Sequence, residues 1–118
     1  DKLFDKAEQQ NGVLYISAVL KDMSADDLRE IGTRLCTLAP KVGVVLGSVT
    51  EGKPLLLVCM SEELSKSGAP AAGAIVKEVG KLIGGGGGGQ AHFASAGGKN
   101  AAGLEEAVKQ ASQKLQGK

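Results

Sequence analysis

The sequence has few aromatic residues. It contains no Trp, one Tyr and two Phe among 118 residues. RNA-binding domains that stack bases on the face of a sheet need two or three aromatic side chains at fixed positions. The sequence therefore excludes a stacking platform of that kind, and its core must be built from Val, Leu, Ile and Ala.

Histidine and cysteine are also scarce, which limits catalysis and metal binding. His92 is the only histidine, and Ser95 should lie on the opposite face of the same short strand. No carboxylate lies near His92 in the sequence to orient its imidazole. Cys36 and Cys59 lack the C-x-x-C spacing of zinc sites. We therefore expect no catalytic residue, no metal and no cofactor, and we expect two buried free thiols in a reducing cytosol.

The sequence has neither a long apolar run nor a large net charge. No window approaches the ~18 apolar residues of a membrane span, and no signal peptide opens the chain. We therefore expect a cytoplasmic protein without a membrane partner. The formal net charge is +1 and 42% of the residues are hydrophobic, which is typical of a single globular domain. Because the chain opens with Asp1 and not with Met, we expect it to be part of a longer protein, and processing of the N-terminus is the alternative.

Glycine, by contrast, is abundant. Six consecutive glycines, Gly84–Gly89, precede a short segment of small residues that ends in Gly97, Gly98 and Lys99. Glycine adds no side chain to a core, but it lets another molecule approach the main chain closely. Gly97 and Gly98 should lead into a helix N-terminus, where free N–H groups favour a phosphate. The alternative is a flexible connector followed by a simple turn, and composition does not choose between the two.

Charge is unevenly distributed around these glycines. Residues 64–100 contain one acid, Glu78, and four lysines. This local excess predicts contacts with the phosphates of a nucleic acid, while a solvated helix face remains the alternative. The predicted nucleic-acid-binding residues are Lys66, Lys77, Lys81, Gly84, Gly85, Gly86, Gly87, Gly88, Gly89, Gln90, His92, Gly97, Gly98 and Lys99.

The hydrophobic periodicity predicts an α/β fold, a small mixed β-sheet of about four to five strands flanked by α-helices. Residues 1–11 should be a helical tail, the end of an upstream helical segment, and residues 12–118 one globular domain. Ser24 and Asp27 should form a capping box at the start of a helix that ends by Pro40. The expected strands are 13–20, 42–49, 55–60 and 92–96, and the other expected helices are 61–67, 70–83 and one that Asn100 caps.

The glycine-rich stretch resembles the C-terminal signature of alanyl-tRNA synthetases. In that family a glycine run is followed by Arg-Pro-Asp-Met-Ala-Gln-Ala-Gly-Gly. The glycine run, Ala94, Ala96 and the Gly97-Gly98 pair match, whereas Gln90 and His92 replace the family's Arg and Asp. Similarity extends to the hairpin that ends at residues 57–64 and to the helix at 72–79. The domain that carries this signature is the DHH-associated domain.

The resemblance implies a tRNA-binding module at the end of a synthetase, with alanine-specific tRNA and the other synthetase domains as partners. Such a module grips the outer corner of tRNA, links aminoacylation with editing and, in some members, assists formation of a homodimer. The activation of alanine belongs to other domains, so the chain itself should not be an enzyme. The alternative is the substrate-binding lobe of a DHH phosphoesterase. That branch usually has a His directly after its glycines, whereas Gln90 and Ala91 intervene here, which favours the synthetase.

Overall fold

A computed structural model describes residues 6–10, 13–21, 23–37, 40–50, 52–66, 71–89 and 92–115 of the chain. In chain order, its elements are β1 (Lys6–Gln10), β2 (Val13–Lys21), α1 (Ala25–Leu35), β3 (Val42–Thr50), β4 (Lys53–Met60), α2 (Glu62–Lys66), α3 (Ala72–Val79), the 3-10 turn η1 (Gly80–Ile83), β5 (Gly86–Gly89), β6 (Phe93–Gly97), the 3-10 turn η2 (Ala101–Gly103) and α4 (Leu104–Leu115).

The strands form one mixed sheet with the order β1-β2-β3-β4-β6-β5. β2 and β3 run parallel, and each of the other neighbouring pairs is antiparallel. α1 joins the two parallel strands, because parallel neighbours need a crossover connection. β3 and β4 form a hairpin through a tight turn that includes Gly52. The φ of Gly52 is 78°, a left-handed value that glycine adopts without a steric penalty.

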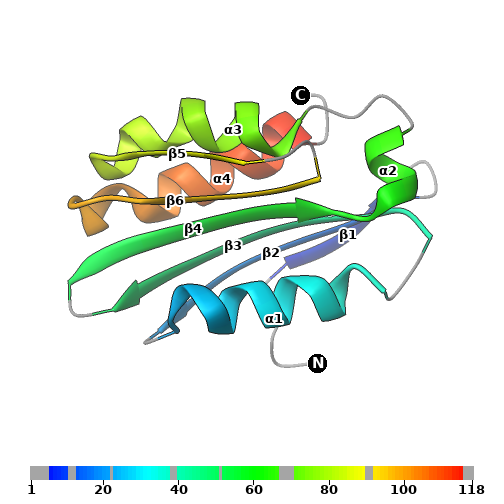
Figure 1. Cartoon of the computed structure of the whole chain (residues 1–118), viewed down its shortest axis with the longest axis horizontal. Coiled ribbons are helices and arrows are strands. Elements are labelled where there is room, and N and C mark those ends of the chain that lie inside the picture. Colours follow the sequence, from blue (N-terminus) through cyan, green and yellow to red (C-terminus); the bar gives the residue numbers. More distant parts are fainter. Residues whose placement is uncertain are drawn as a thin grey trace.

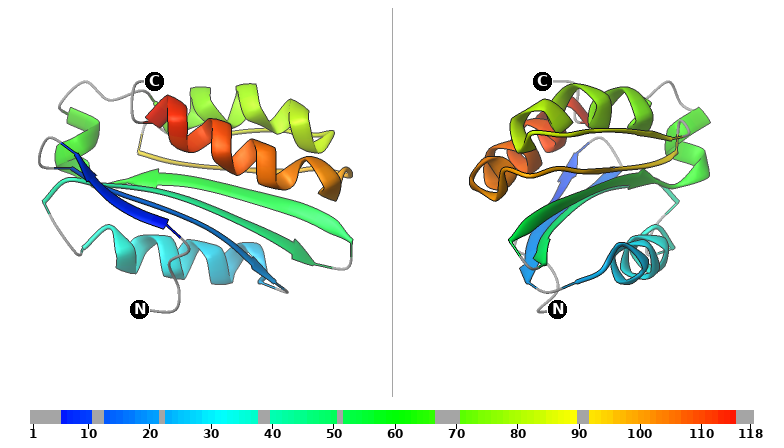
Figure 2. Two further views of the ribbon diagram at one scale, coloured as in Figure 1. Left: turned by 180° about the vertical axis from the view of Figure 1, so that it is seen from behind. Right: turned by 60° about the vertical axis from the view of Figure 1, so that its left-hand side comes forward.

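Helices cover both faces of the sheet (Figure 1). α1 lies on one face, while α3 and α4 lie side by side on the other (Figure 2). Two glycines allow this close packing. A Cβ at Gly47 of β3 would lie 2.8 Å from Cγ2 of Val108 in α4, and one at Gly32 of α1 would lie 2.8 Å from Sγ of Cys59 in β4. The backbones of helix and sheet can therefore approach more closely than larger residues would permit.

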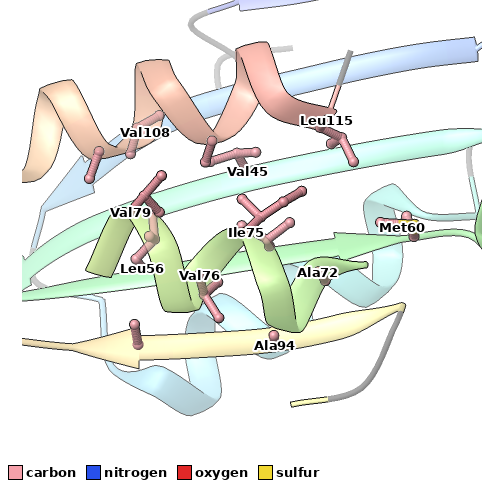
Figure 3. Close-up of a cluster of buried hydrophobic side chains, with 14 of the residues drawn as sticks. Val45, Leu56, Met60, Ala72, Ile75, Val76, Val79, Ala94, Val108 and Leu115 are labelled. Carbon is pink, nitrogen blue, oxygen red and sulfur yellow. The ribbon is translucent and has the colours of Figure 1, made fainter. Parts of the chain in front are cut away.

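The larger core lies between the sheet and the pair α3–α4 (Figure 3). Val76 of α3 and Ala94 of β6 are fully buried in it, together with Val58 of β4. A second core lies between the sheet and α1, and includes Leu28 and Leu46. Burying one such Val or Leu side chain stabilises the fold by roughly 1.5–3 kcal/mol, so these apolar stripes hold the three layers together.

Most of the predicted architecture is confirmed. The α/β class, the mixed sheet, the parallel pairing of β2 with β3 and the β3–β4 hairpin are all present. The capping box of α1 is also present, since Ser24 Oγ accepts the N–H of Asp27 and the Asp27 carboxylate accepts the N–H of Ser24. The helix ends at Leu35, before Pro40.

The prediction of a helix at the N-terminal end is wrong for Lys6–Gln10, which form strand β1. This strand pairs with β2 from Lys6 opposite Ser17 to Gln10 opposite Val13. Lys, Ala, Glu and Gln favour helices, but pairing at the sheet edge overrides this weak preference. The intervening residues 11–12 are Asn-Gly, which is a strong hairpin signal in the sequence. Residues 1–5 lie outside the described chain, and the division into residues 1–11 and 12–118 stays a prediction.

The end of the chain differs from the prediction in one further respect. Asn100 was expected to cap the last helix, but α4 begins at Leu104, after the turn η2. The side-chain amide of Asn100 makes no capping hydrogen bond and instead donates to the carbonyl of Leu82, at 3.5 Å. Asn100 therefore connects this turn to η1.

Candidate functional site

The glycine run is mostly a strand, and not a flexible connector. Gly86–Gly89 form β5, which pairs antiparallel with β6 from Gly86 opposite Gly97 to Gly89 opposite Ala94. Glycine is depleted in strands, so a run of glycines does not predict a strand. β5 is the last strand of the described sheet, beside α3.

The first two glycines of the run make the turn between η1 and β5. Gly84 ends η1 with a φ of 71°, and its N–H donates to the carbonyl of Lys81. The N–H of Gly85 donates to the carbonyl of Gly80. A Cβ on Gly85 would collide with the carbonyl oxygen of Gly97. Glycine is favoured at position 84 by the left-handed φ, and it is required at position 85 because the main chain of Gly97 passes directly against it.

The main-chain N–H groups directly after Gly97 were expected to be free for a phosphate, but three of them make hydrogen bonds within the domain. The N–H of Gly98 donates to the carbonyl of Pro54, at 3.2 Å. The N–H groups of Lys99 and Asn100 both donate to the carbonyl of Ile83, at 2.8 Å each. Three amides that would have faced an anion are therefore used inside the domain. Their role is structural, because they fasten the end of β6 to β4 and to η1.

Three of the predicted lysines are exposed on α3, on η1 and directly after β6, and we name Lys77, Lys81 and Lys99 the lysine surface. Lys77 lies one turn after Gly73 on α3, and a Cβ on Gly73 would lie 2.9 Å from the carbonyl oxygen of Gly89. Residues four apart share a helix side, so Lys77 lies on the side that faces β5. Lys81 belongs to η1, and the backbone of Lys99 adjoins Gly84. Lys77 and Lys99 therefore lie beside the glycine run, and Lys81 lies between them in the chain, close enough to Glu78 for its charge to lower the pKa of that carboxyl.

The lysine surface is exposed, and none of its side chains takes part in an ion pair with another described residue. The neighbouring Glu78 instead pairs with Lys114 of α4, whose Nζ lies 2.8 Å from Oε1. This hydrogen bond, with the charges of Lys114 and Lys81, lowers the pKa of the Glu78 carboxyl. Sequence reasoning missed Lys114, because only the fold brings α4 beside α3. Lys114 balances the negative charge of Glu78, the one acid among the predicted lysines.

Lys66 and His92 lie apart from the lysine surface. Lys66 of α2 pairs with Glu62, at 3.0 Å, and lowers the pKa of that carboxyl, with a small contribution from the charge of His92. α2 lies at the end of the domain where α3 begins (Figure 1), whereas Lys81 belongs to η1, which follows the other end of α3, and the N–H of Lys99 donates to Ile83 of η1. The structure therefore divides the predicted binding residues into two groups. Gln90 lies outside the described residues.

Sequence reasoning also missed a cavity on the opposite face, between α1 and the strands β4 and β6. Its volume is about 730 Å³, and Arg29, Cys36, Cys59, His92 and Phe93 contribute to its lining. The guanidinium of Arg29 lies over the ring of Phe93, 5.4 Å from its centre, a favourable cation–π arrangement. No sequence pattern connects these residues, because α1 and β6 meet only through the fold.

Two structural findings bear on cofactors and membranes. Within the described ranges, no three His, Cys, Asp or Glu side chains lie close enough together to hold a metal ion. In the same part of the chain, no helix has the length and apolar character needed to cross a membrane.

Comparison with known protein families identifies the fold. The DHHA1 domain family matches residues 12–117, which is most of the chain. The chain belongs to the DHHA1 domain family. Among solved structures, this DHHA1 domain is similar to the C-Ala domain from Aquifex aeolicus alanyl-tRNA synthetase. The TM-score is 0.81 and the sequence identity 30%, over 93% of this chain and 97% of that chain.

Curated relatives of this DHHA1 domain agree with that comparison. An alanine–tRNA ligase of Herpetosiphon aurantiacus is 39% identical over 111 residues, and one of Christiangramia forsetii is 40% identical over 110 residues. These alignments cover 94% and 93% of this chain, but 12% of each ligase. The DHHA1 domain is therefore homologous to the C-Ala domain of alanyl-tRNA synthetase and corresponds to a small part of the curated relatives.

Proposed function

We propose that this DHHA1 domain is the non-catalytic tRNA-binding part of an alanine–tRNA ligase. It grips the outer corner of alanine-specific tRNA, so that aminoacylation and editing centres in other domains act on one bound molecule. The observation that carries the proposal is the similarity to a C-Ala domain over 93% of the chain. Activation of alanine, in this proposal, takes place outside the chain.

The lysine surface is our candidate for the contact with tRNA. Lys77, Lys81 and Lys99 are exposed and are free of ion pairs with the described residues. Lysine ammonium groups placed along a surface bind the phosphates of a nucleic acid backbone without reading its sequence. The glycines at the two ends of the run, Gly84 and Gly89, are exposed beside them. An RNA backbone could approach the main chain there without meeting side chains.

The electrostatic attraction should be modest. Glu105 and Glu106 are exposed in the first turn of α4, which follows Lys99 closely, and they oppose the approach of phosphates. With roughly three or four phosphate contacts, raising the salt concentration from about 50 to about 200 mM should weaken binding by roughly two decades or less. Shape complementarity to the tRNA must supply the remaining affinity.

Charge reversal tests the lysine surface. In the variant Lys77→Glu/Lys81→Glu, tRNA affinity should fall and the slope of log affinity against log salt should decrease by about two. The matched control is Arg29→Glu/Arg34→Glu, which makes the same charge change on exposed residues of α1, across the sheet. The control should affect affinity much less. Filter binding measures affinity, and thermal unfolding verifies that each variant is folded.

Two results would contradict this placement. One is an equal loss of affinity in the two charge-reversed variants, which would mean that only net charge matters. The other is unchanged affinity and unchanged melting temperature in Lys77→Glu/Lys81→Glu, which would reduce the lysine surface to a solvated helix face.

A further inference from the structure

Cys36 and Cys59 lie next to each other in the fold, although 22 other residues separate them in the sequence. Cys36 is the C-cap residue that directly follows α1, and Cys59 is in β4, between Val58 and Met60. Their Sγ atoms are 3.7 Å apart, and both are free thiols. A disulfide bond is about 2.05 Å long, so the sulfurs must approach by about 1.7 Å to form one.

The packing around the pair favours this approach. Gly32 lies one turn before Cys36 on the same side of α1, directly over the sulfur of Cys59. A larger residue at Gly32 would hold the helix away from β4. Cys36 follows the last residue of α1 as its C-cap, so its backbone is at a helix end and not within a rigid turn. A small movement at this end can join the two sulfurs.

The two thiols differ in exposure and in acidity. Cys36 is partly exposed and Cys59 is buried, which corrects the expectation that both are buried. Both line the cavity between α1 and the sheet, and the partly exposed Cys36 is the one that a small solute can reach. The hydrogen bond with Cys59 lowers the pKa of the Cys36 thiol despite partial burial, and the same hydrogen bond, burial and the charge of Cys36 raise the pKa of Cys59. Cys36 is thus the thiol that ionises first.

We propose that Cys36 and Cys59 form an oxidisable pair, which a hydroperoxide converts into an intramolecular disulfide between the end of α1 and β4. The Cys36 thiolate attacks a peroxide oxygen, the O–O bond breaks, and the alkoxide that leaves takes up the proton that Cys36 lost. Cys36 becomes a sulfenic acid. The Cys59 sulfur then attacks the Cys36 sulfur, the S–O bond breaks, and the hydroxide leaves as water with the Cys59 proton. Two thiols are oxidised, and one hydroperoxide is reduced to an alcohol and water.

Peptide mapping of the whole chain tests this directly. The reduced, folded protein is treated with hydrogen peroxide, its remaining thiols are alkylated, and it is digested with trypsin without a reductant. Cleavage after Arg34, Lys41 and Lys66 releases Cys36 in residues 35–41 and Cys59 in residues 42–66, because Pro54 protects Lys53. We expect these two peptides to be linked, with a mass about 2 Da below their sum. A reductant should separate them.

Single variants test the order of the steps. In Cys59→Ser, the sulfenic acid of Cys36 has no partner and should accumulate as an adduct with dimedone. In Cys36→Ser, the buried Cys59 should give at most about a tenth of that adduct. The proposal is overturned if the wild-type peptides stay separate at a peroxide dose that oxidises the urea-unfolded chain. It is also overturned if the linked product is a dimer of two chains, or if Cys59 is the more reactive thiol.

Discussion

The hairpin of β5 and β6 leads to a sharp prediction about two adjacent glycines. In Gly98→Ala, the new Cβ would collide with the carbonyl oxygen of Ile83 and would lie 3.0 Å from Cγ1 of the same isoleucine. That carbonyl also accepts the N–H groups of Lys99 and Asn100. The chain must shift and weaken these bonds, which should cost about 2–4 kcal/mol of the free energy of unfolding. The melting temperature should fall by roughly 10 °C.

Gly97→Ala is the matched control, one residue away. A Cβ on Gly97 would lie 3.6 Å from Cδ2 of Leu55, an ordinary contact, and the residue is exposed. This substitution should change the free energy of unfolding by no more than about 0.5 kcal/mol. Thermal melts of both variants by circular dichroism provide the comparison. If Gly97→Ala is as damaging as Gly98→Ala, contact with the Ile83 carbonyl is not the reason for glycine at position 98.

Two further predictions concern hydrogen bonds and acid stability. The buried Ser61 Oγ accepts the N–H of Val42 and donates to the carbonyl of Pro40. Ser61→Ala should therefore lower the free energy of unfolding, measured in urea, by about 1–3 kcal/mol. An unchanged urea midpoint would contradict this role. Lys114 lowers the folded-state pKa of Glu78. The stabilisation from this ion pair is therefore present above the unfolded pKa of Glu78 and is lost as the pH falls through its folded pKa. The difference in melting temperature between the wild type and Lys114→Gln should therefore diminish in acid, and a difference that grows in acid would refute this pairing.

The α1 helix and the β3–β4 hairpin could be predicted because their signals are local. Ser24 and Asp27 form the predicted capping box, and the two apolar runs of the hairpin flank a turn that contains Gly52. β1 was missed because the helix preference of residues 6–10 opposes their pairing at the sheet edge. β5 was missed because a strand of glycines has no side-chain pattern, and only its pairing with β6 defines it.

The candidate site was predicted in part. Charge along the sequence indicated Lys77, Lys81 and Lys99, which the fold leaves exposed near the glycine hairpin. The prediction of free main-chain N–H groups after Gly97 was wrong, because the sequence does not show that the N–H groups of Lys99 and Asn100 donate to the Ile83 carbonyl. The pairing of Lys114 with Glu78 depends on contact between α3 and α4, so it could not be found by reading along the chain.

The proposed role is tested most directly by comparing two RNAs that share an acceptor stem. One is an intact alanine-specific tRNA, and the other is a minihelix that lacks the D arm and therefore the outer corner. The account predicts that the 118-residue chain binds the intact tRNA more tightly, and that reversing Lys77 and Lys81 removes much of this advantage. Equal affinity for the two RNAs at the same salt concentration would contradict recognition of the outer corner.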